Sequence, residues 1–171
     1  MKPILILVLA AILLTSCEKE DTNSRSTSNF GFTGNSVDYR WDFAPNPSSA
    51  LTGANLWKTT SANTNDTIYI LTGVNQASNI ELKCAIHTSQ LKPSVYRTVT
   101  SMSDPWIESI CRVNGELYGT RTGDVVTVTI TSMDRNFVSG TFGAVMHDLN
   151  WGGLQEYRIW NGYFNRVEIP H

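Results

Sequence analysis

Histidine is the first residue type to consider for catalysis or metal binding, and the chain has three: His87, His147 and His171. His147 precedes Asp148 in a predicted loop, a pair suited to a base or a metal ligand. One histidine and one aspartate fall short of the three or four ligands of a zinc site. The sequence also has no His-Glu-x-x-His, Gly-x-Ser-x-Gly, Gly-rich phosphate-loop or Cys-x-x-Cys motif. We therefore predict no catalytic residues, no metal site and no cofactor.

Acidic side chains are the other candidates for catalysis. Glycoside hydrolysis needs two carboxyl groups held a fixed distance apart across a cleft. The candidates are Asp104, Glu108, Glu116 and Glu156, but Glu116 lies at a predicted turn and Glu108 is predicted to pair with Arg121. An enzyme that hydrolyses glycan or peptide, with residues that converge only in the fold, stays open as an alternative.

The aromatic residues are more suggestive of ligand binding, because the chain has five tryptophans and six tyrosines. Trp106 follows Ser-Asp-Pro, and Trp151 precedes two glycines in a predicted loop. Either indole is a candidate platform for a sugar ring, since sugar C–H groups stack on aromatic faces. The other three tryptophans, Trp41, Trp57 and Trp160, are predicted to fill the core and cover its ends.

Short β-strands must position these side chains. In residues 124–131, β-branched apolar residues alternate with threonine, which predicts a strand with Val126, Val128 and Ile130 on its buried face. Residues 79–86 alternate in the same way. A third strand is predicted over residues 66–71, ended by Thr-Gly.

Turn residues connect the predicted strands. Asn114-Gly115 is typical of a type I′ hairpin turn, which pairs Val113 with Glu116 and places Cys111 beside Tyr118. Turn signals recur about every ten residues along the chain, and no long segment has helical periodicity. The sequence therefore predicts an all-β fold with little helix, an antiparallel sandwich or partly closed barrel of about eight short strands.

Apart from Cys17, the chain has two cysteines that a disulfide could join, Cys84 and Cys111. An exported protein reaches an oxidising compartment in which a disulfide persists. Cys84 lies on the apolar face of its predicted strand. The two residues either form a disulfide or remain as two buried thiols.

The N-terminus has the layout of an export signal. One positive charge, Lys2, precedes the apolar residues 4–14, which are too few to span a bilayer. The segment ends in Leu-Thr-Ser-Cys17, which resembles the bacterial lipobox. We predict that residues 1–16 are a signal peptide and that Cys17 carries the lipids that anchor the protein to a membrane.

Residues 17–29 contain no large apolar side chain after the cysteine and are predicted to be a disordered tether. The acidic residues 18–21 resemble the signal that exports Bacteroidota lipoproteins to the cell surface, although an acidic run also serves solubility alone. We expect an outer-membrane lipoprotein, with the cell surface and the periplasmic face as alternatives. We expect residues 30–171 to form one domain.

Charge argues against a nucleic-acid partner. The whole chain has a formal charge of −2, and removal of the segment that contains Lys2 leaves −3. A protein that binds nucleic acid needs a basic stripe to meet the phosphates, and the sequence has none.

From about Leu51 to Ile169 the chain resembles a family of small Bacteroidota lipoprotein domains of uncharacterised function. Four pieces carry the resemblance: Asn-Leu-Trp-Lys at 55–58, the strand at 80–86 with Pro-Ser-Val-Tyr at 93–96, Thr127 to Phe142 with Val-Ser-Gly-Thr-Phe, and Tyr157 to Phe164 with Asn-Gly-x-Phe. The resemblance implies an all-β domain in the envelope and supplies no catalytic residue. Gly140 and Gly162 are expected at bulges or close backbone contacts, and the two phenylalanines that end these motifs in the core.

Together these features favour a non-catalytic, envelope-anchored binding module whose ligand is a glycan or a partner envelope protein. The small hydrolase is one alternative. A purely structural lipoprotein with no small ligand is the other.

Overall fold

The computed structural model describes residues 28–43, 52–61, 66–98, 106–150 and 154–169, and these fold into β-strands with one short 3-10 turn and no α-helix. The all-β prediction is confirmed. The strands are β1 (Ser28–Gly34), β2 (Val37–Phe43), β3 (Thr52–Thr60), β4 (Thr67–Asn75), β5 (Ile80–His87), β6 (Ser94–Arg97), β7 (Trp106–Val113), β8 (Glu116–Gly119), β9 (Val126–Met133), β10 (Phe137–Asp148) and β11 (Glu156–Glu168), with the 3-10 turn η1 (Gln76–Ser78) after β4.

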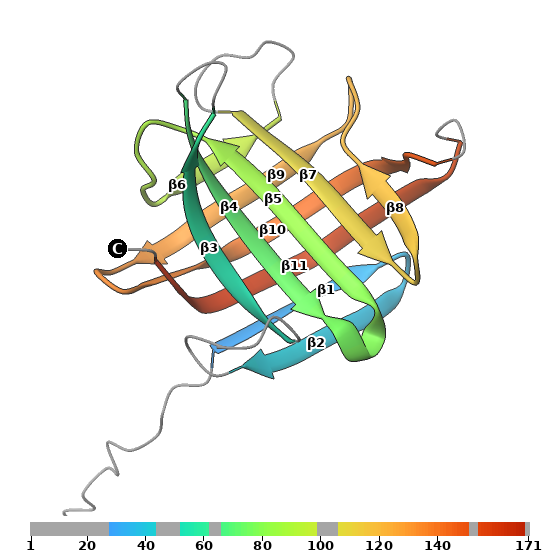
Figure 1. Cartoon of the computed structure of the whole chain (residues 1–171), viewed down its shortest axis with the longest axis horizontal. Helices are drawn as coiled ribbons and strands as arrows, with labels where there is room; N and C mark the ends of the chain where they lie inside the picture. The colour runs from blue at the N-terminus through green and yellow to red at the C-terminus, as the bar shows by residue number, and fades with distance from the viewer. Residues whose placement is uncertain (1–27, 44–51, 62–65, 99–105, 151–153, 170–171) are drawn as a thin grey trace, which may run out of the picture.

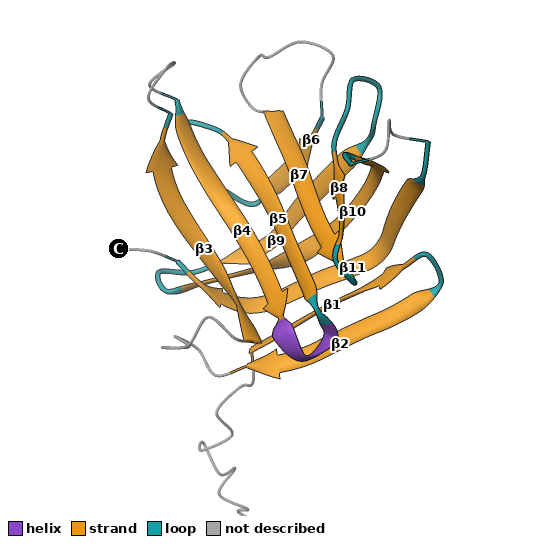
Figure 2. Ribbon diagram, turned by 45° about the vertical axis from the view of Figure 1, so that its right-hand side comes forward, coloured by secondary structure: helices purple, strands orange, loops and turns teal. Residues whose placement is uncertain are grey.

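The strands form one antiparallel sheet that curls into a nearly closed barrel (Figure 1). The order is β2-β1-β11-β10-β8-β7-β5-β4-β3, and β9 and β6 continue from β10 on a second branch. In Figure 2 the steep strands β3, β4, β5 and β7 cross the flatter strands β9, β10, β11 and β1 behind them. The two ends of this strand order meet where Trp41 Nε1 of β2 donates to the backbone carbonyl of Gly53 of β3 at 3.4 Å.

The described part has eleven strands rather than about eight. The additional elements are short or lack an apolar pattern: β6 and β8 have four residues each, and β2 alternates charged residues with aromatic ones. The predicted third strand also continues past Thr72-Gly73 to Asn75. Gly73 does not end β4. It lies against the Phe30 ring, which a side chain at position 73 would overlap.

The predicted hairpin at Asn114-Gly115 is confirmed. Both residues have positive φ, 52° and 91°, as a type I′ turn requires. Val113 pairs with Glu116, and Cys111 pairs with Tyr118.

The predicted contact between Glu108 and Arg121 is wrong. Thr120 accepts the Ser109 amide on its side-chain oxygen at 2.7 Å, and the chain then turns away from β7. Glu108 instead lies 3.6 Å from His87 Nε2, and the Arg121 guanidinium donates to the Asp148 carbonyl.

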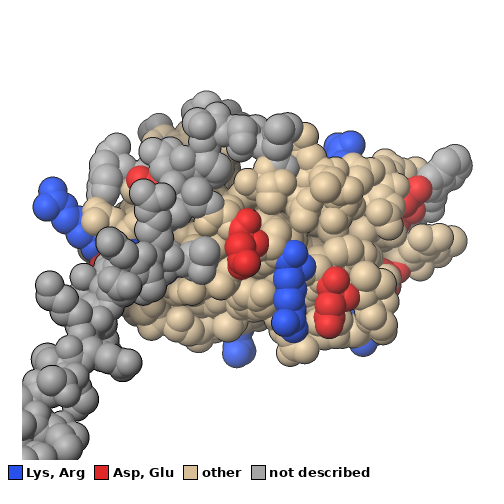
Figure 3. Space-filling model, turned by 90° about the horizontal axis from the view of Figure 1, so that it is seen from below, with Lys and Arg blue, Asp and Glu red and all other residues tan. Residues whose placement is uncertain are grey.

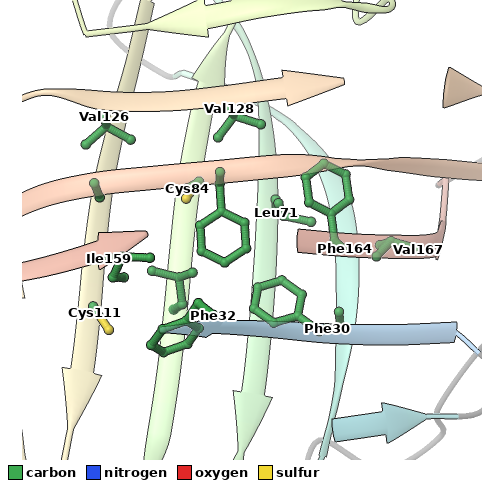
Figure 4. Packing of buried hydrophobic residues seen from close by; sticks show 14 of the residues in the cluster. Phe30, Phe32, Leu71, Cys84, Cys111, Val126, Val128, Ile159, Phe164 and Val167 are labelled. Carbon is green, nitrogen blue, oxygen red and sulfur yellow. The ribbon is translucent and has the colours of Figure 1, made fainter. Parts of the chain in front are cut away.

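The barrel interior is filled by the apolar side chains that the strands turn inward (Figure 4). The Phe30 ring stacks on Trp41 with centroids 5.0 Å apart and contacts Phe142 at 5.2 Å. Val126, Val128 and Ile130 are buried on one face of β9, as the alternation predicted. Burial of large apolar side chains stabilises a fold by about 1.5–3 kcal/mol each, so this core is the main source of stability.

Gly140 and Gly162 lie where two parts of the chain approach closely, as expected. A Cβ atom on Gly140 would lie 2.1 Å from the Thr129 carbonyl, and the pairing of β10 shifts register at this residue. A Cβ on Gly162 would lie 2.5 Å from the Phe142 carbonyl. Phe142 and Phe164 are both buried in the core.

The first described strand starts at Ser28, two residues before the predicted domain boundary at residue 30. Ser28 is fully buried, pairs with Phe43 and donates its hydroxyl to the Arg166 carbonyl at 2.8 Å. Residues 1–27, and with them Cys17, lie outside the described residues. Among the described residues, no helix has the length and apolar character needed to cross a bilayer.

Candidate functional site

The two tryptophans predicted as ligand platforms do not have described side chains. Trp106 is the first residue of β7, and its backbone pairs with His87. Trp151 lies outside the described residues. Both remain predictions.

Trp57 is the most exposed tryptophan side chain in the described part of the chain, with 55% of its surface accessible to solvent. The expectation that it covers the core is wrong, and so is the expectation for Trp160, which is 40% exposed; Trp41 is buried as expected. Because side chains alternate along a strand, the burial of Leu56 on β3 turns its neighbour Trp57 outward.

The Trp57 indole is held against the outer face of the sheet. Its Nε1–H donates to Thr72 Oγ1 at 3.1 Å. Thr72 lies on β4, diagonal to Trp57, which pairs directly with Ile70. Thr72 is only 5% exposed although it is on the outer face. The bond therefore fixes the ring beside Thr72 while over half of the Trp57 side chain stays accessible.

Polar side chains continue from Trp57 across the neighbouring strands. Asn55 on β3 is opposite Thr72, which is opposite Lys83 on β5. Glu81, two residues before Lys83, is opposite Arg112 on β7.

With Trp57 and Thr72 these residues line an open hollow of about 400 Å³. We call it the β3–β7 groove and define it by Asn55, Trp57, Thr72, Glu81, Lys83 and Arg112. It lies on the outside of the barrel, on strands that face the viewer in Figure 1.

The groove carries more positive than negative charge. Lys83 Nζ lies 2.6 Å from Glu81 Oε1, so these two charges neutralise each other. Arg112 is exposed, and no carboxylate among the described residues lies within ion-pair distance of it. By contrast, the underside of the barrel on the side of β2 shows few charges, of both signs (Figure 3).

The described lining of the groove offers several binding groups and a single carboxyl group. Glu81 is the one acid among the residues that line it, whereas glycoside hydrolysis uses two carboxyl groups. An exposed indole beside amide, hydroxyl and charged groups combines an apolar surface with hydrogen-bonding partners. Such a combination fits a ligand with both apolar and hydroxylated faces.

His147 has a different position and partner from those predicted. It lies within β10 rather than in a loop, and its Nδ1 is 2.9 Å from Asp124, not Asp148. The Asp124 carboxylate is nearly buried and also accepts the Arg121 amide at 2.8 Å. Asp148 instead accepts the Asn150 amide at 2.7 Å.

A carboxylate that accepts from Nδ1 orients a histidine and leaves Nε2 for proton transfer. The Asp124–His147 pair therefore has one element of a general base. Within the described segments, no group of three histidine, cysteine or acidic residues is placed to hold a metal ion.

The acids considered from sequence are not brought together as a catalytic pair in the described part of the chain. Glu108 and Glu116 lie at opposite ends of the β7–β8 hairpin. Glu156 pairs with Arg158, whose hydrogen bond and charge hold the pKa of that carboxyl below its ordinary value. Asp104 lies outside the described residues.

Cys84 and Cys111 are both buried free thiols. Of the two alternatives left open by the sequence, the structure has the buried thiols. Cys84 is opposite Ser109, and Cys111 is opposite Leu82, so the cysteines are diagonal neighbours across β5 and β7. Diagonal positions are about 7–8 Å apart, beyond the usual Cα separation of a disulfide.

Comparison with known proteins gives no match: no family model, no curated protein and no solved structure corresponds to this chain. The resemblance to Bacteroidota lipoprotein domains stays a prediction from the sequence.

Proposed function

We propose that this protein is a saccharide-binding lipoprotein of the bacterial envelope that holds its ligand in the β3–β7 groove. The observation that carries the proposal is the Trp57 indole, which is exposed and fixed by its bond to Thr72. The lipobox at Cys17 and the tether after it support an envelope location, with the domain held at a distance from the membrane.

The chemistry of a sugar ring matches that of the groove. One face of a pyranose presents C–H groups, which pack on the flat indole, and its rim presents hydroxyls that both donate and accept hydrogen bonds. Asn55 supplies both kinds of partner beside Trp57, and Lys83 and Glu81 supply charged ones. A ring already held in place loses little conformational entropy on binding, which favours affinity.

The size of the groove favours a chain of sugars over a single ring. The groove spans four adjacent strands, β3, β4, β5 and β7. Trp57 lies on the first and Arg112 on the last, so the two are separated by three inter-strand spacings and are also offset along the strands. At about 4.8 Å for each spacing, the two side chains are roughly 15–20 Å apart. An oligosaccharide can contact both ends.

The experiment that tests this proposal compares two exposed tryptophans. The full-length protein, Trp57→Ala and Trp160→Ala are screened for binding to a panel of neutral and acidic polysaccharides by affinity electrophoresis. Wild type and Trp160→Ala should bind the same polysaccharide, and Trp57→Ala should lose at least tenfold in affinity. Loss of binding in Trp160→Ala alone would place the site elsewhere and contradict the proposal.

The Asp124–His147 pair favours a second candidate function, a hydrolase with His147 as its base. Its test is release of reducing ends or of peptide by the wild-type protein and by His147→Gln. Activity that His147→Gln abolishes would support the hydrolase. If the protein has no activity on glycan or peptide but still binds polysaccharide, only the binding function is supported.

A further inference from the structure

The distribution of charge in the β3–β7 groove indicates which saccharides it accepts. Three charged side chains line it, and two of them, Lys83 and Glu81, form an ion pair with each other. Arg112 is directly opposite Glu81 in the β5–β7 ladder, yet the Glu81 carboxylate contacts Lys83. The guanidinium therefore has no ionic partner among the described residues.

Arginine is well suited to bind a carboxylate. Its planar guanidinium presents parallel N–H donors that match the two oxygens of a carboxylate, and such bidentate bonds are roughly twice as strong as neutral ones. Arg112 is exposed on the outer face of β7, so an incoming anion reaches it without disturbing the core.

General electrostatic attraction does not supply this binding. The whole chain has a formal charge of −2, which repels a polyanion at long range. Binding of an acidic ligand must then depend on a local cation, and the groove has one at the end opposite the indole.

Resting on the proposed saccharide function, we propose that the groove selects acidic saccharides, with a uronate carboxylate on Arg112 and a ring several units farther along the same saccharide chain on Trp57. Lys83 and Glu81 lie between these two positions and contact hydroxyl groups. The separation of the indole and the guanidinium sets the distance between the stacked ring and the acidic one.

The test uses the full-length protein in detergent and three uronate polysaccharides: polygalacturonate, alginate and hyaluronan. Each is compared with its carboxyl-reduced form, which keeps the linkages and removes the charge. The proteins are wild type, Arg112→Gln, Arg112→Lys and Arg40→Gln, the last being a control because Arg40 is an exposed arginine on β2. Calorimetry or affinity electrophoresis gives the dissociation constants.

We expect wild type to bind at least one acidic polysaccharide about tenfold more tightly than its reduced form. Arg112→Gln should remove that preference while leaving affinity for the reduced form unchanged, Arg112→Lys should keep part of it, and Arg40→Gln should keep all of it. Equal binding of both forms, still dependent on Trp57, would overturn the acidic preference and keep the saccharide function. Absence of binding to every form would overturn the acidic preference, and absence of binding to the neutral polysaccharides of the first panel as well would overturn both proposals.

Discussion

The Nε1–H group of Trp57 donates to the hydroxyl oxygen of Thr72 across β3 and β4 at 3.1 Å. This bond joins an exposed side chain to a covered one, since Thr72 is 5% exposed and Trp57 is 55% exposed. It holds the indole beside Thr72, where the ring forms one end of the β3–β7 groove.

Thr72→Val tests the role of this bond. Valine keeps the shape and the strand preference of threonine but removes the acceptor, so the indole loses its anchor and must be ordered by the ligand. We expect saccharide affinity to fall about fivefold, since a net hydrogen bond contributes about 1 kcal/mol. Thr72→Ser, which keeps the hydroxyl, is the control and should bind as wild type. Full affinity in Thr72→Val would show that the bond is irrelevant to binding.

Gly140→Ala should destabilise the barrel strongly. The added methyl carbon would lie 2.1 Å from the Thr129 carbonyl and 2.6 Å from the Phe164 ring, and the backbone atom cannot move without distorting β9. We expect a loss of about 2–4 kcal/mol and a Tm lower by roughly 5–15 °C. Gly143→Ala is the matched control on the same strand, because its nearest contact would be 3.4 Å. Similar melting of the two variants would contradict the packing at Gly140.

Gly115→Val tests the hairpin turn. Gly115 has a φ of 91°, and a β-branched residue at positive φ costs about 1–2 kcal/mol. We expect Tm to fall by roughly 3–6 °C, measured by thermal unfolding, and Gly115→Asn to fall by less because asparagine tolerates this region. An unchanged Tm in Gly115→Val would mean that the β7–β8 turn adopts another conformation.

Because the two thiols are buried, we expect the free energy of unfolding to fall at alkaline pH. Burial raises the pKa of Cys84 from its ordinary 9.0 to about 11, and burial together with the charge of the neighbouring thiol raises the pKa of Cys111 as well. The folded state therefore keeps these protons to a higher pH than the unfolded state does. The stability that the two thiols contribute is fully present below pH 9 and falls as the pH rises from 9 toward 11.

Denaturant unfolding at pH 7.5 and pH 10 measures this effect, which should be about 1 kcal/mol smaller for Cys84→Ala than for wild type. A thiol reagent should modify neither cysteine in the folded protein at pH 8 and both after unfolding. Two cysteines that stay unreactive in the unfolded protein would reveal a disulfide instead.

The sequence predicted the elements whose residues alternate strictly. The apolar face of β9, the Asn114-Gly115 turn and the close contacts of Gly140 and Gly162 were all predicted, because each depends on neighbours in the chain or on a residue type with one strong preference. The hairpin of β1 and β2 was missed, since Ser28 and Asn29 looked like part of a polar tether. Only pairing with Phe43 and the contact to Arg166 show that Ser28 is inside.

The groove could not be predicted in the same way. Trp57 was assigned to the core because tryptophan is usually buried, although the alternation with Leu56 already indicated that it faces outward. Arg112 and Glu81 are 31 positions apart in the chain, and only the register of β5 against β7 brings them opposite each other. The Asp124–His147 pair was missed for the same reason, since the adjacent Asp148 was the obvious partner in sequence.

The most direct test of saccharide binding in the groove follows the five indole N–H signals of the ¹⁵N-labelled full-length protein by NMR. The Trp57 signal is assigned from Trp57→Phe, and an oligosaccharide of the polysaccharide that wild type binds most tightly is then added to saturation. The Trp57 signal should shift progressively while that of Trp160 stays in place. A saccharide that binds without moving the Trp57 signal, or no shift of any signal at saturating concentrations, would contradict saccharide binding in the β3–β7 groove.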